Sequence, residues 1–485
     1  MSASRREDRT RLDGFELEIF KLVREGSTSK QWREWLRAPL EHAAAEGNLD
    51  LFTRLMDAGA DGSAGWRGCY GRTLLVAAAY GESEEMVLAL LKAGAKDDLN
   101  VKYGDNQASA LHVAAVGGDE KVSNALMLAG ANPNVRSDDG RSPLHLAADG
   151  AHDVVVNNLL LKGADPKMRA GEGQTPLHLA AARGHALCVS KLLIGGADKD
   201  SRDRNDKTPL ILAARGNHLG AVEELLAAGA NVEIRDDFDP SYSALDMAVD
   251  RGHADVARAL LRHGSRVSSC DDDGYTALHV AADGYHISDN RDVIRVLLEA
   301  GADIEAKSTD HHGWTPLHFA ASTGSSGNIG ALLESGADVN ARNASGGTPL
   351  HDACCGCRAG AVKALVRWGA DEKLTDRFGQ TAEENLNPSR EDEEDCQRIR
   401  HMLARAPADR SWRRRQWLVL ARSFPARVQL AQVSDGGGGN STKIGKTSKG
   451  VGDRRRDETA DLARLVGRVI GLDVEGVFRL VVGFL

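Results

Sequence analysis

The heptapeptide Thr175-Pro176-Leu177-His178-Leu179-Ala180-Ala181 decides the fold, because variants of it recur along most of the chain. Most copies stand about a dozen residues after a glycine, and ten such glycines follow one another in steps of 33 to 37 residues. A regular period of this length is the sequence signature of a protein built from stacked repeats. The glycines are Gly59, Gly94, Gly130, Gly163, Gly196, Gly229, Gly264, Gly301, Gly336 and Gly369.

Each copy of the heptapeptide predicts the start of a helix. Thr175 can accept a backbone N–H as the N-cap residue, and Pro176 at the first helical position has no N–H to leave unpaired. The alanine pair lets a second helix pack closely. The glycine after that second helix, such as Gly196, can take the left-handed conformation that ends it. The sequence therefore predicts a chain of short helix pairs.

These residues together resemble the ankyrin repeat, a helix-turn-helix with an extended loop of about this length. The resemblance runs from about Arg37 to Met402. It implies an all-α fold: an ankyrin-repeat α-solenoid of about ten to eleven repeats with short β-hairpin or extended loops, plus a small C-terminal helical tail. Two repeats carry extra residues, around 97–106 and 285–291, and we expect these insertions in surface loops.

The chain is expected to have five segments. They are an N-terminal helical cap (1–36), the ankyrin repeats (37–405), a basic helical segment rich in Trp and Arg (406–433), a linker rich in Gly, Ser and Lys (434–456) and apolar C-terminal helices (457–485). Two short apolar helices cannot bury their own surface. We therefore expect the tail to contact the repeats, a second protein or a membrane surface, and the candidate contact residues are Trp412, Trp417, Phe478 and Phe484.

Composition favours an intracellular protein. No window approaches the roughly 18 to 20 apolar residues that a membrane span needs, and the first residues do not resemble a signal peptide. Seven cysteines without framework spacing indicate free thiols in a reducing compartment. The expected location is the cytoplasm, with the nucleus as the alternative.

Several residues are of types found in metal or catalytic sites, but their positions in the repeat favour a structural role. Six histidines follow the leucine of the repeat, where the resemblance implies hydrogen bonds between adjacent units: His112, His145, His178, His279, His318 and His351. Cys354, Cys355 and Cys357 stand beside His351, which leaves a zinc or redox site open, although packing plus an exposed thiol is the favoured interpretation. We expect no metal, no cofactor and no catalytic constellation, and hence no enzyme.

The charge is divided between an acidic array and a basic tail. Residues 409–485 carry 15 Lys and Arg against 8 Asp and Glu, a net of +7, so the other residues carry −9 − 7 = −16. A row of Arg and Lys follows the repeats, and we expect it to pair with Asp138, Asp203 and Asp236. Because the repeats are acidic overall, no nucleic acid is expected as a partner. The row is Arg136, Arg169, Arg202, Arg235, Lys307 and Arg342.

The densest aromatic group of the array is the candidate partner-binding site. Aromatic anchors dominate the energetics of protein interfaces. Tyr275 and Trp314 directly precede a helix start, where a loop base faces the concave surface. The alternative is that these rings seal the loops and the inserted segment. The group consists of Phe238, Tyr242, Tyr275, Tyr285, Trp314 and Phe319.

The function predicted from these observations is a non-enzymatic scaffold that binds a protein through its concave face of loops and inner helices. The alternative is a substrate adaptor, for example of a ubiquitin ligase, whose C-terminal tail recruits a second partner. Asn340 lies in Asp338-Val339-Asn340, which resembles ankyrin sites that an oxygenase hydroxylates. Asn340 would then be a modified position and not a catalytic residue.

Overall fold

The computed structural model describes residues 36–57, 60, 72–237, 241–271, 273–284, 289–310, 312–386 and 394–406. Residues 1–35 of the expected N-terminal cap, and all residues of the expected tail from 407 on, lie outside this part of the chain. So do the tail residues Trp412, Trp417, Phe478 and Phe484. The expected division into five segments therefore stays a prediction.

Where the heptapeptide is present, the repeat begins with a capped helix, as the sequence predicts. Thr175 is extended (φ −92°, ψ 166°) and forms a capping box with His178, while Pro176 opens the helix. The Nδ1 atom of His178 accepts the Thr175 N–H at 3.1 Å. The ring therefore satisfies a backbone donor that a helix start leaves without an intrahelical partner.

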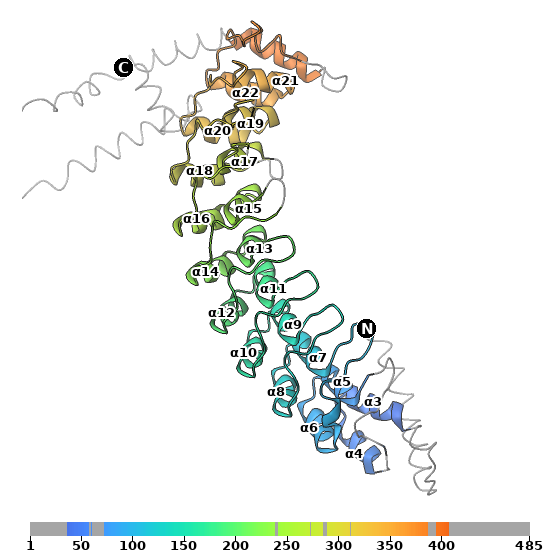
Figure 1. Ribbon diagram of the computed structural model, residues 1–485. Helices are drawn as coiled ribbons and strands as arrows, with labels where there is room; N and C mark the ends of the chain where they lie inside the picture. The colour runs from blue at the N-terminus through green and yellow to red at the C-terminus, as the bar shows by residue number, and fades with distance from the viewer. Residues whose placement is uncertain are drawn as a thin grey trace, which may run out of the picture. The chain divides into compact units, whose positions relative to one another are not determined.

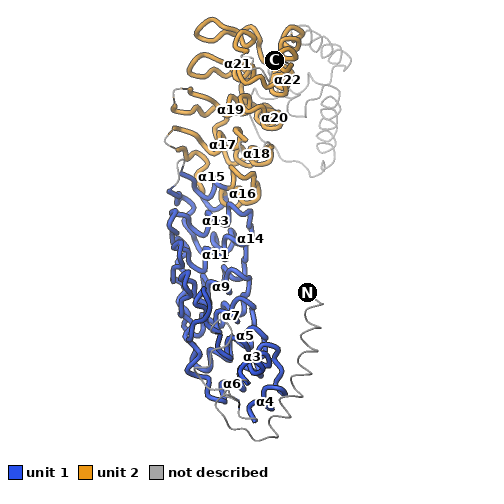
Figure 2. Tube along the Cα trace, turned by 90° about the vertical axis from the view of Figure 1, so that its right-hand side faces the viewer, with its two compact units in different colours: residues 1–247, 262–264 blue, residues 248–261, 265–485 orange. Residues whose placement is uncertain are grey.

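The described residues up to 247, with 262–264, form the first of two compact units (Figure 2). Within it the first helices of successive pairs pack side by side, and so do the second helices from α6 on (Figure 1). We call the first helix of each pair the inner helix. The helices are α3 (Arg37–Ala45), α4 (Leu49–Asp57), α5 (Leu74–Tyr80), α6 (Glu84–Lys92), the 3₁₀ helix η2 (Ala95–Asp98), α7 (Ala110–Gly117), α8 (Glu120–Leu128), α9 (Pro143–Asp149), α10 (Asp153–Leu161), α11 (Pro176–Arg183), α12 (Ala186–Ile194), α13 (Pro209–Arg215) and α14 (Leu219–Ala227).

The second unit consists of residues 248–261 and the described residues from 265 on (Figure 2). Its inner helices α17, α19 and α21 pack in sequence, as do α18, α20 and α22. Its helices are α17 (Ala277–Asp283), α18 (Arg291–Glu299), α19 (Pro316–Thr323), α20 (Ser326–Glu334), α21 (Pro349–Cys355) and α22 (Ala359–Arg367), followed by a helix over 394–406. The chain passes between the two units at α15 (Ala244–Asp250) and α16 (Ala254–Arg262).

The core of each unit lies between the inner helices and the second helices. The repeat leucine, represented by Leu144 in the first unit and Leu350 in the second, is completely buried. The alanine pair after it, such as Ala147 and Ala148, is buried as well. Small residues at this position let neighbouring helices approach closely, which is the packing that the sequence predicts.

The extended loops between the helix pairs, which we call fingers, are joined to one another by backbone hydrogen bonds. In the first unit Asp138 N–H donates to the Asn106 carbonyl at 2.9 Å, and in the second unit Thr309 N–H donates to the Asp273 carbonyl at 2.8 Å. Strand-like pairing in the described fingers is limited to isolated antiparallel bridges, such as Tyr103 with Ala108. Each finger is therefore fixed by its neighbour.

The expected pairing of the Arg and Lys row with Asp138, Asp203 and Asp236 is wrong. Arg136 donates to the Arg169 carbonyl at 2.9 Å, and Lys307 donates to the Arg342 carbonyl at 2.9 Å. Arg202 and Arg235 pair instead with Asp206 and Asp246. The aspartates of the finger accept backbone N–H groups of their own loop, as Asp203 does from Asn205 and Lys207. Four members of the row tie their repeat to the next through a backbone carbonyl: Arg136, Arg169, Lys307 and Arg342.

The expectation that the cysteines are free thiols is wrong for two of them. Cys357 and Cys396 form a disulfide, with their Cα atoms 5.6 Å apart. Cys357 lies in the turn after α21, and Cys396 is buried on the helix over 394–406. The cross-link attaches that helix to the last described repeat. Cys188, Cys270, Cys354 and Cys355 are free.

None of the helices in the described ranges has both the length and the apolar character that a bilayer crossing requires.

Candidate functional site: an aromatic cluster on the second unit

Three of the predicted aromatic residues lie together in the second unit. Phe319 is on α19, while Tyr275 and Trp314 each stand one residue before an N-cap, Thr276 and Thr315. The Phe319 ring lies between the other two, with centroid distances of 5.2 Å to Tyr275 and 5.0 Å to Trp314. Both contacts are edge-to-face, the geometry that aromatic quadrupoles favour. We call Tyr275, Trp314 and Phe319 the aromatic cluster.

The aromatic cluster is half-buried and keeps part of its surface accessible. The His279 ring lies 5.5 Å from Phe319 beneath it, and the His312 ring lies 5.4 Å from Trp314 at its margin. His279 is itself fixed, because its Nε2 atom bonds the Trp314 carbonyl at 3.1 Å. His279 therefore fixes the backbone of Trp314, whose side chain belongs to the aromatic cluster.

Asp310 fixes the loop that carries Trp314. Its Oδ1 atom accepts hydrogen bonds from the Ser308 hydroxyl at 2.6 Å and from the His312 and Gly313 N–H groups at 3.1 Å. Its Oδ2 atom accepts the Tyr275 hydroxyl at 2.9 Å. One carboxylate thus joins the loop to an aromatic side chain from the preceding repeat.

The surroundings keep the Tyr275 hydroxyl protonated and the Asp310 carboxyl ionised. Burial, with the hydrogen bond to Asp310 and its charge, raises the pKa of Tyr275 to about 12, so the hydroxyl remains a donor. Burial acts to raise the pKa of Asp310, but its hydrogen bonds outweigh burial and leave that pKa below its usual value. The cluster therefore presents three rings beside an ionised carboxylate.

The other predicted residues lie elsewhere or outside the described chain. Tyr242 is in the first unit, where its N–H donates to Asp236 at 2.7 Å. Phe238 and Tyr285 are outside the described residues. Asn340 is half-buried, and its Oδ1 atom accepts the Asp371 N–H at 2.9 Å, which gives it a structural role in the turn between two repeats. Its hydroxylation stays a prediction.

The histidines of the repeat have the structural role that the resemblance implies. All six named histidines bond, through Nε2, a backbone carbonyl of the next repeat, as His145 does with Gln174 at 3.2 Å and His318 with Gly347 at 3.3 Å. Cys357 bonds to Cys396 and not to a metal. Within the described ranges, no group of three or more His, Cys, Asp or Glu is placed to hold a metal ion.

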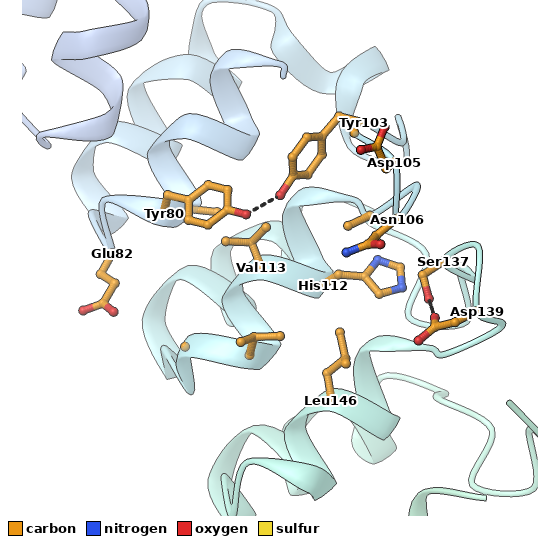
Figure 3. A pocket seen from close by; sticks show the side chains of 15 residues that line it. Tyr80, Glu82, Tyr103, Asp105, Asn106, His112, Val113, Ser137, Asp139 and Leu146 are labelled. Carbon is orange, nitrogen blue, oxygen red and sulfur yellow. Dashed lines mark hydrogen bonds between the residues drawn. The ribbon is translucent and has the colours of Figure 1, made fainter. Parts of the chain in front are cut away.

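Sequence reasoning missed a cavity in the first unit. Tyr80 and Tyr103 line a cavity of about 540 Å³ between α5, α7 and the finger that carries the insertion near 97–106 (Figure 3). The insertion near 97–106 was the one sequence feature that could have indicated this cavity, because a longer finger changes the surface beside it. Tyr80 carried none, since it follows an alanine run that looks like any other repeat.

Comparison with known proteins gives one family for most of the described chain. The family model described as "Ankyrin repeats (3 copies)" matches residues 40–137, 98–170, 144–236, 237–308 and 305–376. This agrees with the helix pairs, the capping boxes and the period.

Individual relatives match over shorter stretches. Palmitoyltransferase Hip14 of Drosophila melanogaster is 36% identical over 110 residues, which are 22% of this chain and 16% of that protein. RelA-associated inhibitor of Mus musculus is 36% identical over 108 residues, 22% of this chain and 12% of that protein. Ankyrin repeat and SOCS box protein 3 of Bos taurus is 34% identical over 110 residues, 22% of this chain and 20% of that protein. The match thus spans a fifth or less of each relative.

Proposed function

Because the chain belongs to the ankyrin-repeat family, we propose that it is a non-enzymatic scaffold that binds a protein partner through its finger loops and inner helices. We place the principal contact at the aromatic cluster of the second unit. The observation that carries this proposal is the half-exposed, edge-to-face packing of Tyr275, Trp314 and Phe319. Residues of these types supply most of the binding energy in many protein interfaces.

Preorganisation supports the same site. The hydrogen bonds of Asp310 and His279 hold the loop and the rings before a partner arrives, so little side-chain entropy remains to be lost on binding. Ankyrin repeats generally mediate protein interactions and are typically non-catalytic. The matches to relatives such as Palmitoyltransferase Hip14 cover only a small part of those proteins. Turnover of a substrate by the purified chain would contradict the proposal.

The test compares two substitutions in the full chain. Trp314→Ala removes a ring of the cluster, and Ile194→Ala removes an apolar side chain that is 81% exposed at the end of α12, a second helix outside the finger loops and inner helices. We expect Trp314→Ala to weaken binding of the captured partner by about 2 kcal/mol or more, roughly 30-fold, as for an interface hot spot. Ile194→Ala should leave the affinity within about twofold. Quantitative affinity purification followed by titration of the purified partner measures both.

The opposite result would give the cluster a sealing role. If Trp314→Ala retains the full set of partners while its far-ultraviolet circular dichroism matches the wild type, the rings only close the finger loops. Loss of partners together with loss of helical signal would be a folding defect. In that case Phe319→Leu, which keeps an apolar side chain on α19 but removes the ring, decides the question.

The alternative function is a substrate adaptor whose tail recruits a second protein. It is favoured by the likeness to a protein named for a SOCS box and by the apolar residues Trp412, Trp417, Phe478 and Phe484 beyond the repeats. In this alternative the aromatic cluster would hold the client and the tail would contact the larger machine. The two functions share the client site and differ in the tail.

A further inference from the structure

The cavity of the first unit lies between the end of one inner helix and the finger of the next repeat. Tyr80 is the last residue of α5, and Tyr103 begins the finger (Figure 3). The volume of about 540 Å³ falls within the roughly 300–1,000 Å³ of typical ligand pockets. Its lining residues belong to the first unit and are separate from the aromatic cluster. We call it the tyrosine pocket.

Two aromatic rings form one wall of the tyrosine pocket. The Tyr80 and Tyr103 rings stand edge-to-face with centroids 6.3 Å apart, and their hydroxyl oxygens are 2.6 Å apart in a hydrogen bond. Tyr80 is 52% exposed, so its ring is available to a ligand. The guanidinium carbon of Arg72 already lies 4.9 Å from the centroid of this ring. The ring therefore already serves as an acceptor for a cation.

The charge of the lining is negative. Glu82, Asp105 and Asp139 contribute carboxylates to the lining, and a resident cation, Arg72, lies beside it over the Tyr80 ring. Asp139 is partly neutralised by Arg141 at 3.1 Å. Glu82 and Asp105 are exposed and lie on the Tyr80 side and the Tyr103 side of the ring pair (Figure 3). The lining therefore has one carboxylate on each side of the ring pair.

The finger that carries Tyr103 is already rigid. Tyr103 and Ala108 exchange two backbone hydrogen bonds of 2.9 and 3.1 Å, and the Gln107 side chain donates to the Gly104 carbonyl at 2.9 Å. The Asn106 carbonyl accepts the Asp138 N–H of the next finger. Because the walls are held before a ligand arrives, binding orders few groups of the protein.

We propose that the tyrosine pocket is a second binding site, which takes an arginine side chain from an extended basic segment of a partner protein. The guanidinium stacks on the part of the Tyr80 ring that Arg72 leaves exposed, and it donates hydrogen bonds to Glu82 or Asp105. Arginine suits this site better than lysine, because its planar group stacks on aromatic faces and donates in a fork that fits a carboxylate. The site is independent of the aromatic cluster, so either can fail without the other.

The test uses the full chain and a fluorescent peptide of alternating Gly and Arg, with matched peptides in which Lys or Glu replaces Arg. We expect the arginine peptide to bind at least fivefold more tightly than the lysine peptide, and the glutamate peptide not to bind. Tyr80→Ala and the double variant Glu82→Gln/Asp105→Asn should each weaken binding of the arginine peptide at least tenfold. Trp314→Ala should leave that affinity unchanged.

Glu120→Gln, an exposed charge on α8 outside the lining, is the matched control and should change the affinity less than twofold. Equal binding of the arginine and lysine peptides, or equal losses in Glu120→Gln and the double variant, would overturn the proposal, because binding would then follow net charge alone. If Tyr80→Ala lowers the midpoint of thermal unfolding, the single variant Asp105→Asn replaces it in the test, because Asp105 lies at the exposed tip of the finger. An unchanged affinity in that variant would also count against the site.

Discussion

At the scale of single residues, the histidine of the repeat is an acceptor at one ring nitrogen and a link to the next repeat at the other. The repeat pattern predicts a bonding role for it between units. Which carbonyl is the partner was not predictable, because that group lies 29 residues later, or 35 for His279, in a finger whose path depends on its own turns. Two repeats replace the histidine by a carboxylate: Asp246 accepts the Ser243 N–H at 3.0 Å, and Glu384 accepts the Thr381 N–H at 2.7 Å.

The buried histidines make the stability of the protein depend on pH. Burial, with the nearby charge of Arg141, lowers the pKa of His145 to about 4, although its bond to the Gln174 carbonyl acts in the opposite direction. The unfolded chain has a histidine pKa of about 6.5. Between about pH 6.5 and 4 the unfolded state therefore binds more protons, so the stability is fully present above pH 6.5 and falls as the pH drops through this window.

We expect His145→Ile to reduce this pH dependence by up to about 3 kcal/mol between pH 7 and pH 4. Isoleucine is a matched choice, because Ile211 fills the same position of another repeat, where Thr208 Oγ1 still caps the helix. The loss of the three hydrogen bonds of the His145 ring should lower the free energy of unfolding at pH 7 by roughly 1–3 kcal/mol. Urea unfolding at pH 7, 6, 5 and 4 measures both effects. A variant with the wild-type pH slope would show that His145 does not carry the titration.

At the scale of secondary-structure elements, the sequence predicted how helices begin and end better than how fingers are joined. Helix starts depend on local chemistry, namely a hydroxyl, a proline and an N3 acceptor, and the heptapeptide contains all three. The hydrogen bonds between finger tips and the disulfide of Cys357 with Cys396 join residues that are tens of positions apart. No local pattern specifies such pairs. The candidate site shows the same division, since the register of Tyr275 and Trp314 was readable but Asp310 as their link was not.

Two glycines that end helices of the same pair should differ in their tolerance of alanine. Gly130 follows α8 with φ +102°, and a Cβ added there would meet nothing within 4 Å. Gly118 ends α7 with φ +72°, and an added Cβ would lie 2.2 Å from Nδ1 of His152. Gly130→Ala should cost about 1 kcal/mol for the backbone conformation alone. Gly118→Ala should cost more, because the His152 ring must move away from its hydrogen bond to the Val116 carbonyl.

Thermal and urea unfolding of the two variants measure the difference. The control is Gly118→Ala combined with His152→Ala, which removes the ring that the new methyl group would meet. In the His152→Ala background, Gly118→Ala should lower the free energy of unfolding by less than it does in the wild-type background. If Gly118→Ala and Gly130→Ala prove equally stable, the contact with His152 is not a constraint on this helix end.

At the scale of the whole molecule, the repeat period predicted the solenoid architecture but not its division into two compact units. The helix starts of neighbouring repeats look alike on both sides of residue 247, and the spacing of the glycines continues across it. Function at this scale depends on which segment holds which partner. The two proposed sites lie in different units, so the molecule can hold two segments of one partner or two different partners.

The last prediction separates the scaffold from the adaptor. A chain that ends at Ala408 keeps all the described residues, with both proposed sites, and removes a segment whose net charge is +7. Because the aromatic cluster is fixed by contacts within its own repeats, we expect the partner lost in Trp314→Ala to bind the shortened chain with an affinity within about threefold of the full chain. The comparison is made at two salt concentrations, since a contact between the basic tail and the acidic repeats would weaken as salt rises. If a defined complex disappears with the tail at both concentrations, the tail is a recruiting element and the adaptor function replaces the scaffold.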